Sequence, residues 1–165
     1  MKIRLEHQNI GAAVMQIAEH EQFTAINALK LNGKPISNAF LINSHVAILC
    51  KYASEPNGND EYVFTFSEDQ MKTLASLLPK HDSLFFGLVC VEGGEICCLT
   101  KAEFEELLGY RRASADKLES QYAILVTIKA KSSFRVYVNA AGKKGKYAGK
   151  QLTVARKAFP DVMFG

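Results

Sequence analysis

The sequence predicts an α/β fold in which a mixed β-sheet is flanked by helices and followed by a basic, strand-forming C-terminal extension. Two capping boxes, Ser67 with Gln70 and Thr100 with Glu103, mark the starts of helices. Short apolar runs bounded by turn residues alternate with these helices, which is typical of strands. The chain has 165 residues, of which 48% are hydrophobic, so it can bury a substantial core. We expect a single domain, with an α/β core over residues 1–112 and the extension over residues 121–165.

The first helix is expected from Asn9 to His20. Asn9 is a favourable N-cap residue, and the apolar residues after it recur at helical spacing. Three strands should follow as a meander, over residues 23–31, 39–42 and 46–52. The first of them ends at Asn32-Gly33, a dipeptide that favours a tight hairpin.

An aromatic strand and a capped helix are expected in the middle of the chain. Tyr62, Phe64 and Phe66 alternate with Val63 and Thr65, which predicts a strand with one aromatic face. Ser67 then opens a helix. Pro79 should end it, because proline lacks the amide proton that a helix interior needs.

The next elements predict the centre of the sheet. Residues 84–91 are apolar almost throughout, as in a strand buried on both faces. Gly93-Gly94 turns the chain, and a helix opened by Thr100 should end at Gly109. The remaining strands are expected over residues 95–99, 122–130 and 134–138, the last with Arg135 and Tyr137 pointing outward.

Charge is unevenly distributed along the chain. Between Ser120 and Pro160 there is no Asp or Glu, whereas nine of the 20 Lys and Arg residues fall there. The other 11 basic residues and all 17 acidic residues leave the rest of the chain with a net charge of −6. A one-signed basic stretch is what contacts to a phosphate backbone require. The candidate nucleic-acid-binding residues are Lys129, Lys131, Arg135, Tyr137, Lys143, Lys144, Lys146, Lys150, Arg156 and Lys157.

The glycines of this segment predict a basic turn between Gly142 and Gly145 that could contact phosphates. Tyr137 and Tyr147 are the candidate residues for stacking on a base or sugar. A solvated hairpin would have the same composition, so both interpretations remain open.

The order of elements over residues 10–108 resembles the core of the PD-(D/E)XK nuclease superfamily, which includes restriction endonucleases and archaeal Holliday-junction resolvases. In that family a helix precedes a strand meander. The second strand brings an Asp, and the third brings a Glu and a Lys one residue apart. The matching positions here are Asn38, Leu49 and Lys51. The resemblance therefore implies a restriction-endonuclease-like core that keeps the lysine and lacks both carboxylates.

Missing carboxylates bear directly on catalysis. Mg²⁺ takes oxygen ligands, and the family lysine positions or activates the attacking water beside it. We therefore expect no cofactor and no working catalytic site, with Lys51 and Asn38 as candidate relics. The alternative interpretation is that Lys51 is an ordinary lysine near the end of a buried strand, with its aliphatic stem on apolar surface and its amine in water. A Mg²⁺-dependent nuclease would need relocated acids, and the candidates are Glu19, Glu21, Glu55, Asp60 and Glu61.

The four cysteines point to a reducing environment. Cys50, Cys90, Cys97 and Cys98 lie in or beside apolar strand-like runs, where a thiol behaves as a small hydrophobic group. Their spacing, and that of the four histidines, matches no zinc-ligand pattern. No apolar run reaches the roughly 18 residues of a membrane span, and residues 1–20 lack a signal-peptide pattern. We expect a cytoplasmic protein that does not engage a membrane.

Nucleic-acid binding without cleavage is the function that these observations favour, with DNA and RNA both open as partners. Two alternatives belong to other classes. One is a divergent Mg²⁺-dependent nuclease, in which Mg²⁺ would be the cofactor. The other is a protein-interaction module, such as a homodimer formed through an edge strand or through the aromatic face of Tyr62, Phe64 and Phe66.

Overall fold

The computed structural model describes residues 1–142 and 145–165 and contains three α-helices and nine strands within them. The helices are α1 (Leu5–Ala18), α2 (Glu68–Leu77) and α3 (Lys101–Ser114), and a 3-10 helix, η1 (Asp161–Phe164), lies at the C-terminal end. The strands are β1 (Ile26–Leu31), β2 (Lys34–Ile42), β3 (Val46–Ala53), β4 (Tyr62–Phe66), β5 (Leu84–Cys90), β6 (Glu95–Thr100), β7 (Tyr122–Thr127), β8 (Phe134–Asn139) and β9 (Tyr147–Val154).

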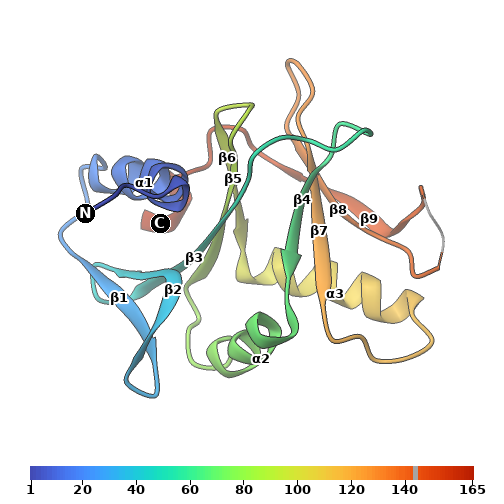
Figure 1. The fold of residues 1–165 in the computed structure, drawn as a ribbon, viewed down its shortest axis with the longest axis horizontal. Coiled ribbons are helices and arrows are strands. Elements are labelled where there is room, and N and C mark those ends of the chain that lie inside the picture. The colour runs from blue at the N-terminus through green and yellow to red at the C-terminus, as the bar shows by residue number, and fades with distance from the viewer. Residues whose placement is uncertain (143–144) are drawn as a thin grey trace.

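These strands form two sheets, whereas the sequence led us to expect one (Figure 1). The first sheet has the order β1-β2-β3-β5-β6 and is mixed, because β3 and β5 run parallel while the other neighbours are antiparallel. The second sheet has the order β4-β7-β8-β9 and is wholly antiparallel. The aromatic strand β4 pairs with β7, so the segments 1–112 and 121–165 share a sheet.

Local signals in the first sheet correspond to the observed turns and strands. β1 and β2 join at Asn32 and Gly33, both with positive φ (51° and 78°), as the favoured two-residue hairpin turn requires. β5 lies between β3 and β6 and is buried along most of its length, as its apolar run predicts. β2 is longer than expected, and Asn38 within it has a φ of 57°.

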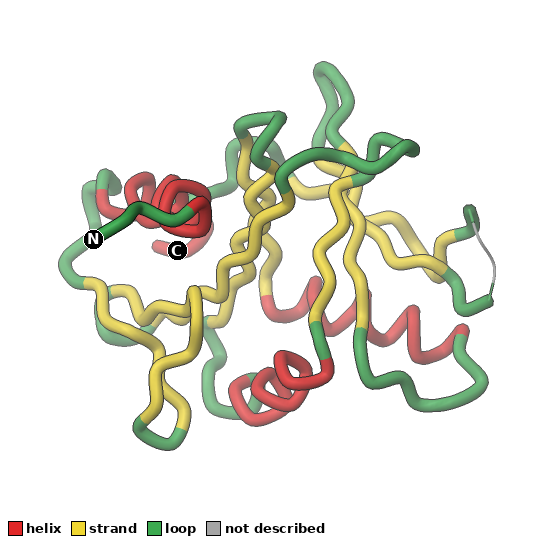
Figure 2. Tube along the Cα trace, in the orientation of Figure 1, coloured by secondary structure: helices red, strands yellow, loops and turns green. Residues whose placement is uncertain are grey.

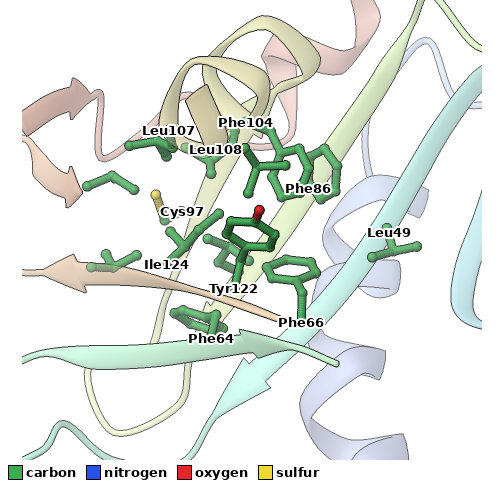
Figure 3. Close-up of a cluster of buried hydrophobic side chains, with 14 of the residues drawn as sticks. Leu49, Phe64, Phe66, Phe86, Cys97, Phe104, Leu107, Leu108, Tyr122 and Ile124 are labelled. Carbon is green, nitrogen blue, oxygen red and sulfur yellow. The ribbon is translucent and has the colours of Figure 1, made fainter. Parts of the chain in front are cut away.

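Two hydrophobic cores lie on opposite sides of the first sheet. Figure 2 shows the backbone elements around that sheet, with α1 and the C-terminal end together on one side of it. The larger core packs that sheet against the inner face of the second sheet and against α2 and α3. Figure 3 shows its aromatic centre, where Phe66, Phe86 and Phe104 meet at ring-centroid distances of 4.0–6.1 Å. The smaller core packs the opposite face of the first sheet against α1 and the C-terminal segment, with Ile17 and Phe159 among its members.

Both capping boxes are confirmed. Ser67 Oγ accepts from Gln70 N (3.2 Å) while Gln70 Oε1 accepts from Ser67 N (2.9 Å). Thr100 and Glu103 make the same reciprocal pair at 3.2 and 3.0 Å. These side chains satisfy the amides that a helix start leaves without partners, which fixes where α2 and α3 begin.

Other predicted boundaries were wrong. α1 begins at Leu5, so Asn9 is a buried residue inside the helix instead of its cap. α3 continues through Gly109 to Ser114. A glycine inside a helix costs about 1 kcal/mol, and the contacts made by the next turn, from Tyr110 and Arg111, offset that cost. Among the described residues, no helix combines the length and apolar character of a membrane span.

Candidate nucleic-acid interface and the Lys51 cavity

One face of the second sheet points away from the core. Phe134, Val136 and Val138 of β8 point into the larger core, so the alternating residues Arg135 and Tyr137 lie on the opposite face. We call this surface the outer face. It comprises Val63, Thr65, Ala123, Leu125, Thr127, Arg135, Tyr137, Asn139, Tyr147 and Thr153.

Tyr137 lies on the outer face but is not open to solvent. Its side chain is only 8% exposed, and its hydroxyl donates a short hydrogen bond to the Glu61 carboxylate. Burial, and then this carboxylate, raise the pKa of Tyr137 well above its ordinary value. The prediction that Tyr137 stacks on a ligand is therefore not supported, because its ring is covered and its hydroxyl is occupied.

Tyr147 is the exposed aromatic residue of the outer face. It begins the edge strand β9 opposite Asn139, and its side chain is 49% exposed. Its ring centroid lies 5.8 Å from that of Tyr137, with the ring planes tilted by 52°. Tyr147 thus rests against a buried, hydrogen-bonded ring and presents its own ring to solvent.

The predicted basic residues lie around the outer face. Arg135 is half-buried and lies opposite Thr127 and Thr153. The lysines that the structure describes in this segment are all exposed, and none of them forms an ion pair: Lys129, Lys131, Lys146, Lys150 and Lys157. The β7–β8 hairpin carries Lys129 and Lys131, and the opposite end of the sheet, where β9 begins, carries Lys146 (Figure 1). The predicted residues Lys143 and Lys144 lie outside the described residues.

Arg156 does not belong to this free basic set. Its Nε donates to Glu95 Oε1 (2.6 Å), and its Nη2 pairs with Glu95 Oε2. Its Nη1 donates to the backbone carbonyls of Lys129 (2.9 Å) and Ser132 (3.0 Å). Every nitrogen of this guanidinium is occupied within the fold, so the prediction that Arg156 contacts nucleic acid is not supported.

A small pocket adjoins the Tyr147 end of the outer face. It has a volume of about 270 Å³ and is lined in part by Thr65, Gln121 and Asn139. Its one charged pair is Arg111 with Glu119, a bidentate ion pair in which both nitrogen–oxygen distances are 2.7 Å. Asn139 is the register partner of Tyr147, which places the pocket beside that ring.

The candidate relics Asn38 and Lys51 meet in a second, larger cavity of about 520 Å³. Leu49, the third position compared with the nuclease motif, lines it as well, together with Asp69 and Gln70 from the first turn of α2. Lys51 Nζ donates to Gln70 Oε1 (3.1 Å) and lies 4.9 Å from the centre of the Phe66 ring. Partial burial lowers the pKa of Lys51 from its ordinary value. The amine is therefore held by the protein instead of extending freely into water.

No relocated acid pair lies in this cavity. Glu19, Glu21, Glu55, Asp60 and Glu61 are all absent from its lining, and Asp69 is its one carboxylate. Across residues 1–142 and 145–165, no three His, Cys, Asp or Glu side chains come together as a metal site would require. Asp69, which sequence reasoning missed, reaches the wall because the Ser67 capping box sets where α2 begins.

Two other predicted features lie inside the protein. The aromatic side chains Tyr62, Phe64 and Phe66 are buried in the larger core, so they cannot form a protein-binding face. All four cysteines are also buried, as their apolar surroundings predict. Burial raises the pKa of Cys50 and of Cys90 to about 12, which suppresses the thiolate that a catalytic cysteine needs.

The decisive partners of these groups are distant in the sequence. Glu61 is 76 residues from Tyr137, and Glu95 is 61 residues from Arg156. No local pattern marks either acid as a partner. The chain was compared with protein-family models, curated proteins and solved structures, and none of them matches it.

Proposed function

We propose that this protein binds nucleic acid without cleaving it, on a nuclease-like scaffold that lacks the metal-binding carboxylates. The observation that carries the proposal is the surplus of positive charge around the outer face. Arg135 and the exposed lysines of this region make no ion pair with any described acid. Such charges gain most by neutralising phosphates, because binding releases the counterions condensed on the nucleic acid.

The arrangement of charges on this surface also supports nucleic-acid binding. The outer face lies on an antiparallel sheet with basic groups near both ends of β8, so a phosphate chain lying across it would meet cations along its path. Two acids near this face have hydrogen-bond partners. Glu61 accepts from Tyr137, and Glu119 is paired with Arg111. The Arg111 guanidinium balances the charge of Glu119, so Glu119 opposes an incoming phosphate less than a free carboxylate would, whereas the neutral Tyr137 hydroxyl leaves the charge of Glu61 in place.

A salt titration tests the proposal. Fluorescence anisotropy with labelled oligonucleotides should show binding at low salt that weakens steeply as salt rises. The triple variant Arg135→Gln, Lys146→Gln and Lys150→Gln should weaken binding to every sequence. It should also reduce the slope of log affinity against log salt by about 2 to 3, since each lost phosphate contact contributes roughly 0.9 on duplex and 0.7 on single strands.

The matched control is the triple variant Lys30→Gln, Lys80→Gln and Lys117→Gln. These lysines are exposed and lie outside residues 120–160, the segment without acidic residues, and their replacement removes the same charge. This control variant should keep the wild-type salt slope. The proposal fails if the wild type shows no affinity at low salt, or if both triple variants weaken binding equally.

A second candidate function is a Mg²⁺-dependent nuclease, and the observation that favours it is that Asp69 and Lys51 line the same cavity. A single carboxylate together with a substrate phosphate is the smallest protein ligand set that Mg²⁺ ordinarily accepts. Metal-dependent cleavage that requires both Lys51 and Asp69 would establish this function in place of the first.

A further inference from the structure

We infer that the outer face accepts a single strand of nucleic acid, one base of which stacks on Tyr147. This inference rests on the proposed function and adds the class of nucleic acid and the residue that selects it. Tyr147 is the aromatic side chain that the outer face leaves exposed, and it lies between the basic end of β9 and the small pocket lined by Asn139.

The Tyr147 ring rests against a neighbour that is itself held in place. Its neighbour Tyr137 is buried, 5.8 Å away between ring centroids, and is tied to Glu61. Glu61 is itself held, since its amide donates to Asn57 Oδ1 (3.0 Å) and its Oε1 accepts from Asn57 Nδ2 (3.1 Å). A ring backed by a rigid partner loses little conformational entropy when a base stacks on it.

The surroundings of Tyr147 suit an unpaired nucleotide. Lys146 directly precedes Tyr147, Lys150 lies three residues after it on β9, and both side chains are exposed, so cations are available near a stacked base for its phosphates. On the far side of Asn139, the pocket offers the side-chain amides of Asn139 and Gln121 and the hydroxyl of Thr65. Amide and hydroxyl groups can pair with the exposed edges of a base that has no Watson–Crick partner.

A duplex cannot use these features. Its base faces are stacked on one another, so a tyrosine at the surface of a sheet reaches only the backbone. Base-on-aromatic stacking is worth roughly 1–3 kcal/mol per base by alanine substitution, which corresponds to about 5- to 150-fold in affinity. Single strands should therefore gain from Tyr147, whereas duplexes should respond only to the basic residues.

The experiment compares Tyr147→Ala, Tyr147→Phe and wild type on labelled single-stranded DNA, single-stranded RNA and duplex DNA. Tyr147→Ala should lose about 5- to 150-fold in single-strand affinity and keep its duplex affinity and salt slope. Tyr147→Phe should keep the single-strand affinity. The two single-stranded arms show whether the strand is RNA or DNA, and either outcome is compatible with the inference.

A fluorescence measurement makes the test independent of any folding defect in Tyr147→Ala. The chain has no tryptophan, so Tyr147→Trp carries a single tryptophan reporter. Its emission should be quenched on adding a single strand and unchanged on adding duplex. Duplex and single strands that bind with equal affinity, or an unquenched Tyr147→Trp in a complex that anisotropy detects, would overturn this inference while leaving the proposed function intact. Absence of binding by any nucleic acid would instead overturn both.

Discussion

Arg156 and Glu95 join the two sheets through a bidentate ion pair. Glu95 begins β6 at the edge of the first sheet, whereas Arg156 follows β9 at the edge of the second. The guanidinium also lies 5.5 Å from the centre of the Phe134 ring and binds two backbone carbonyls of the β7–β8 hairpin. A basic residue of the segment without Asp or Glu, residues 120–160, thus stabilises the fold.

Replacement of Arg156 should therefore lower stability. Arg156→Gln should reduce the free energy of unfolding by about 1–3 kcal/mol, because it leaves the half-buried Glu95 and two carbonyls without their donor. Arg156→Lys should recover little of this loss, since an ammonium cannot reproduce the two-pronged geometry. Urea-induced unfolding measures the free energy of unfolding of both variants. The neighbouring exposed variant Lys157→Gln should change stability by less than about 0.5 kcal/mol, and equal effects at the two positions would contradict the structural role of Arg156.

Gly149 should tolerate no side chain. A Cβ atom there would lie 2.3 Å from the Tyr110 ring of α3, and its φ of +68° is already unfavourable for other residues. Gly149→Ala should cost at least about 2 kcal/mol in the free energy of unfolding through combined overlap and strain. The control is Gly94→Ala, which has a similar φ of +67° and open space around it, so it isolates the strain. Chemical denaturation that shows the same loss at both glycines would refute the Tyr110 contact.

The cysteines should be inert until the protein unfolds. All four are buried, and burial raises the pKa of Cys50 and Cys90 to about 12, so almost no thiolate exists at neutral pH. A thiol-reactive reagent should label the native protein only at the rate at which the protein unfolds locally or globally. In denaturant it should label all four thiols. The control Ser76→Cys places a thiol on the exposed side of α2 and should react at once. Rapid reaction of any native cysteine would show that it is exposed and activated.

The Arg111–Glu119 pair should make stability fall in acid. The hydrogen bonds from Arg111 lower the pKa of Glu119 below its ordinary value of 4.5. Since the folded state binds this proton less readily than the unfolded state, the stabilisation is complete above pH 4.5 and is lost as pH falls through the folded pKa. Glu119→Gln should therefore show a shallower decline in the free energy of unfolding below pH 4.5 than wild type. Glu105→Gln, on the exposed side of α3, should follow the wild-type curve. Superimposable wild-type and Glu119→Gln profiles would argue against the pair.

The Lys51 cavity should not support metal-dependent cleavage. Of the residues that the structure describes, Asp69 is the one carboxylate that lines it, and two carboxylates are the usual requirement of such a metal site, so we expect no Mg²⁺- or Mn²⁺-dependent cutting of duplex, single-stranded or branched DNA. Lys51→Ala should cost roughly 0.5–1.5 kcal/mol of stability, the usual net value of one hydrogen bond, here the one to Gln70. Lys34 lines the same cavity and provides the control. Nicking activity that is abolished in Lys51→Ala and preserved in Lys34→Ala would establish the nuclease function instead.

Local chemistry explains which elements could be predicted. The starts of α2 and α3 depend on side chains three residues apart, and the β1–β2 turn depends on the adjacent pair Asn32-Gly33. The end of α3 was mispredicted for a related reason. Gly109 is a local stop signal, but the ring of Tyr110 in the next turn packs on Gly149, far along the chain.

The sequence by itself determined the helix starts, the buried central strand and the separation of charge between the C-terminal segment and the rest of the chain. Only the tertiary structure decided that β4 pairs with β7 in a second sheet, that Arg156 is bound by Glu95 and Tyr137 by Glu61, and that Tyr147 stays exposed. The physical reason is the range of the interactions. Capping and turn formation act within a few residues, whereas sheet membership and ion pairing follow from burying two sheets against one core, which brings together residues 61 and 76 positions apart.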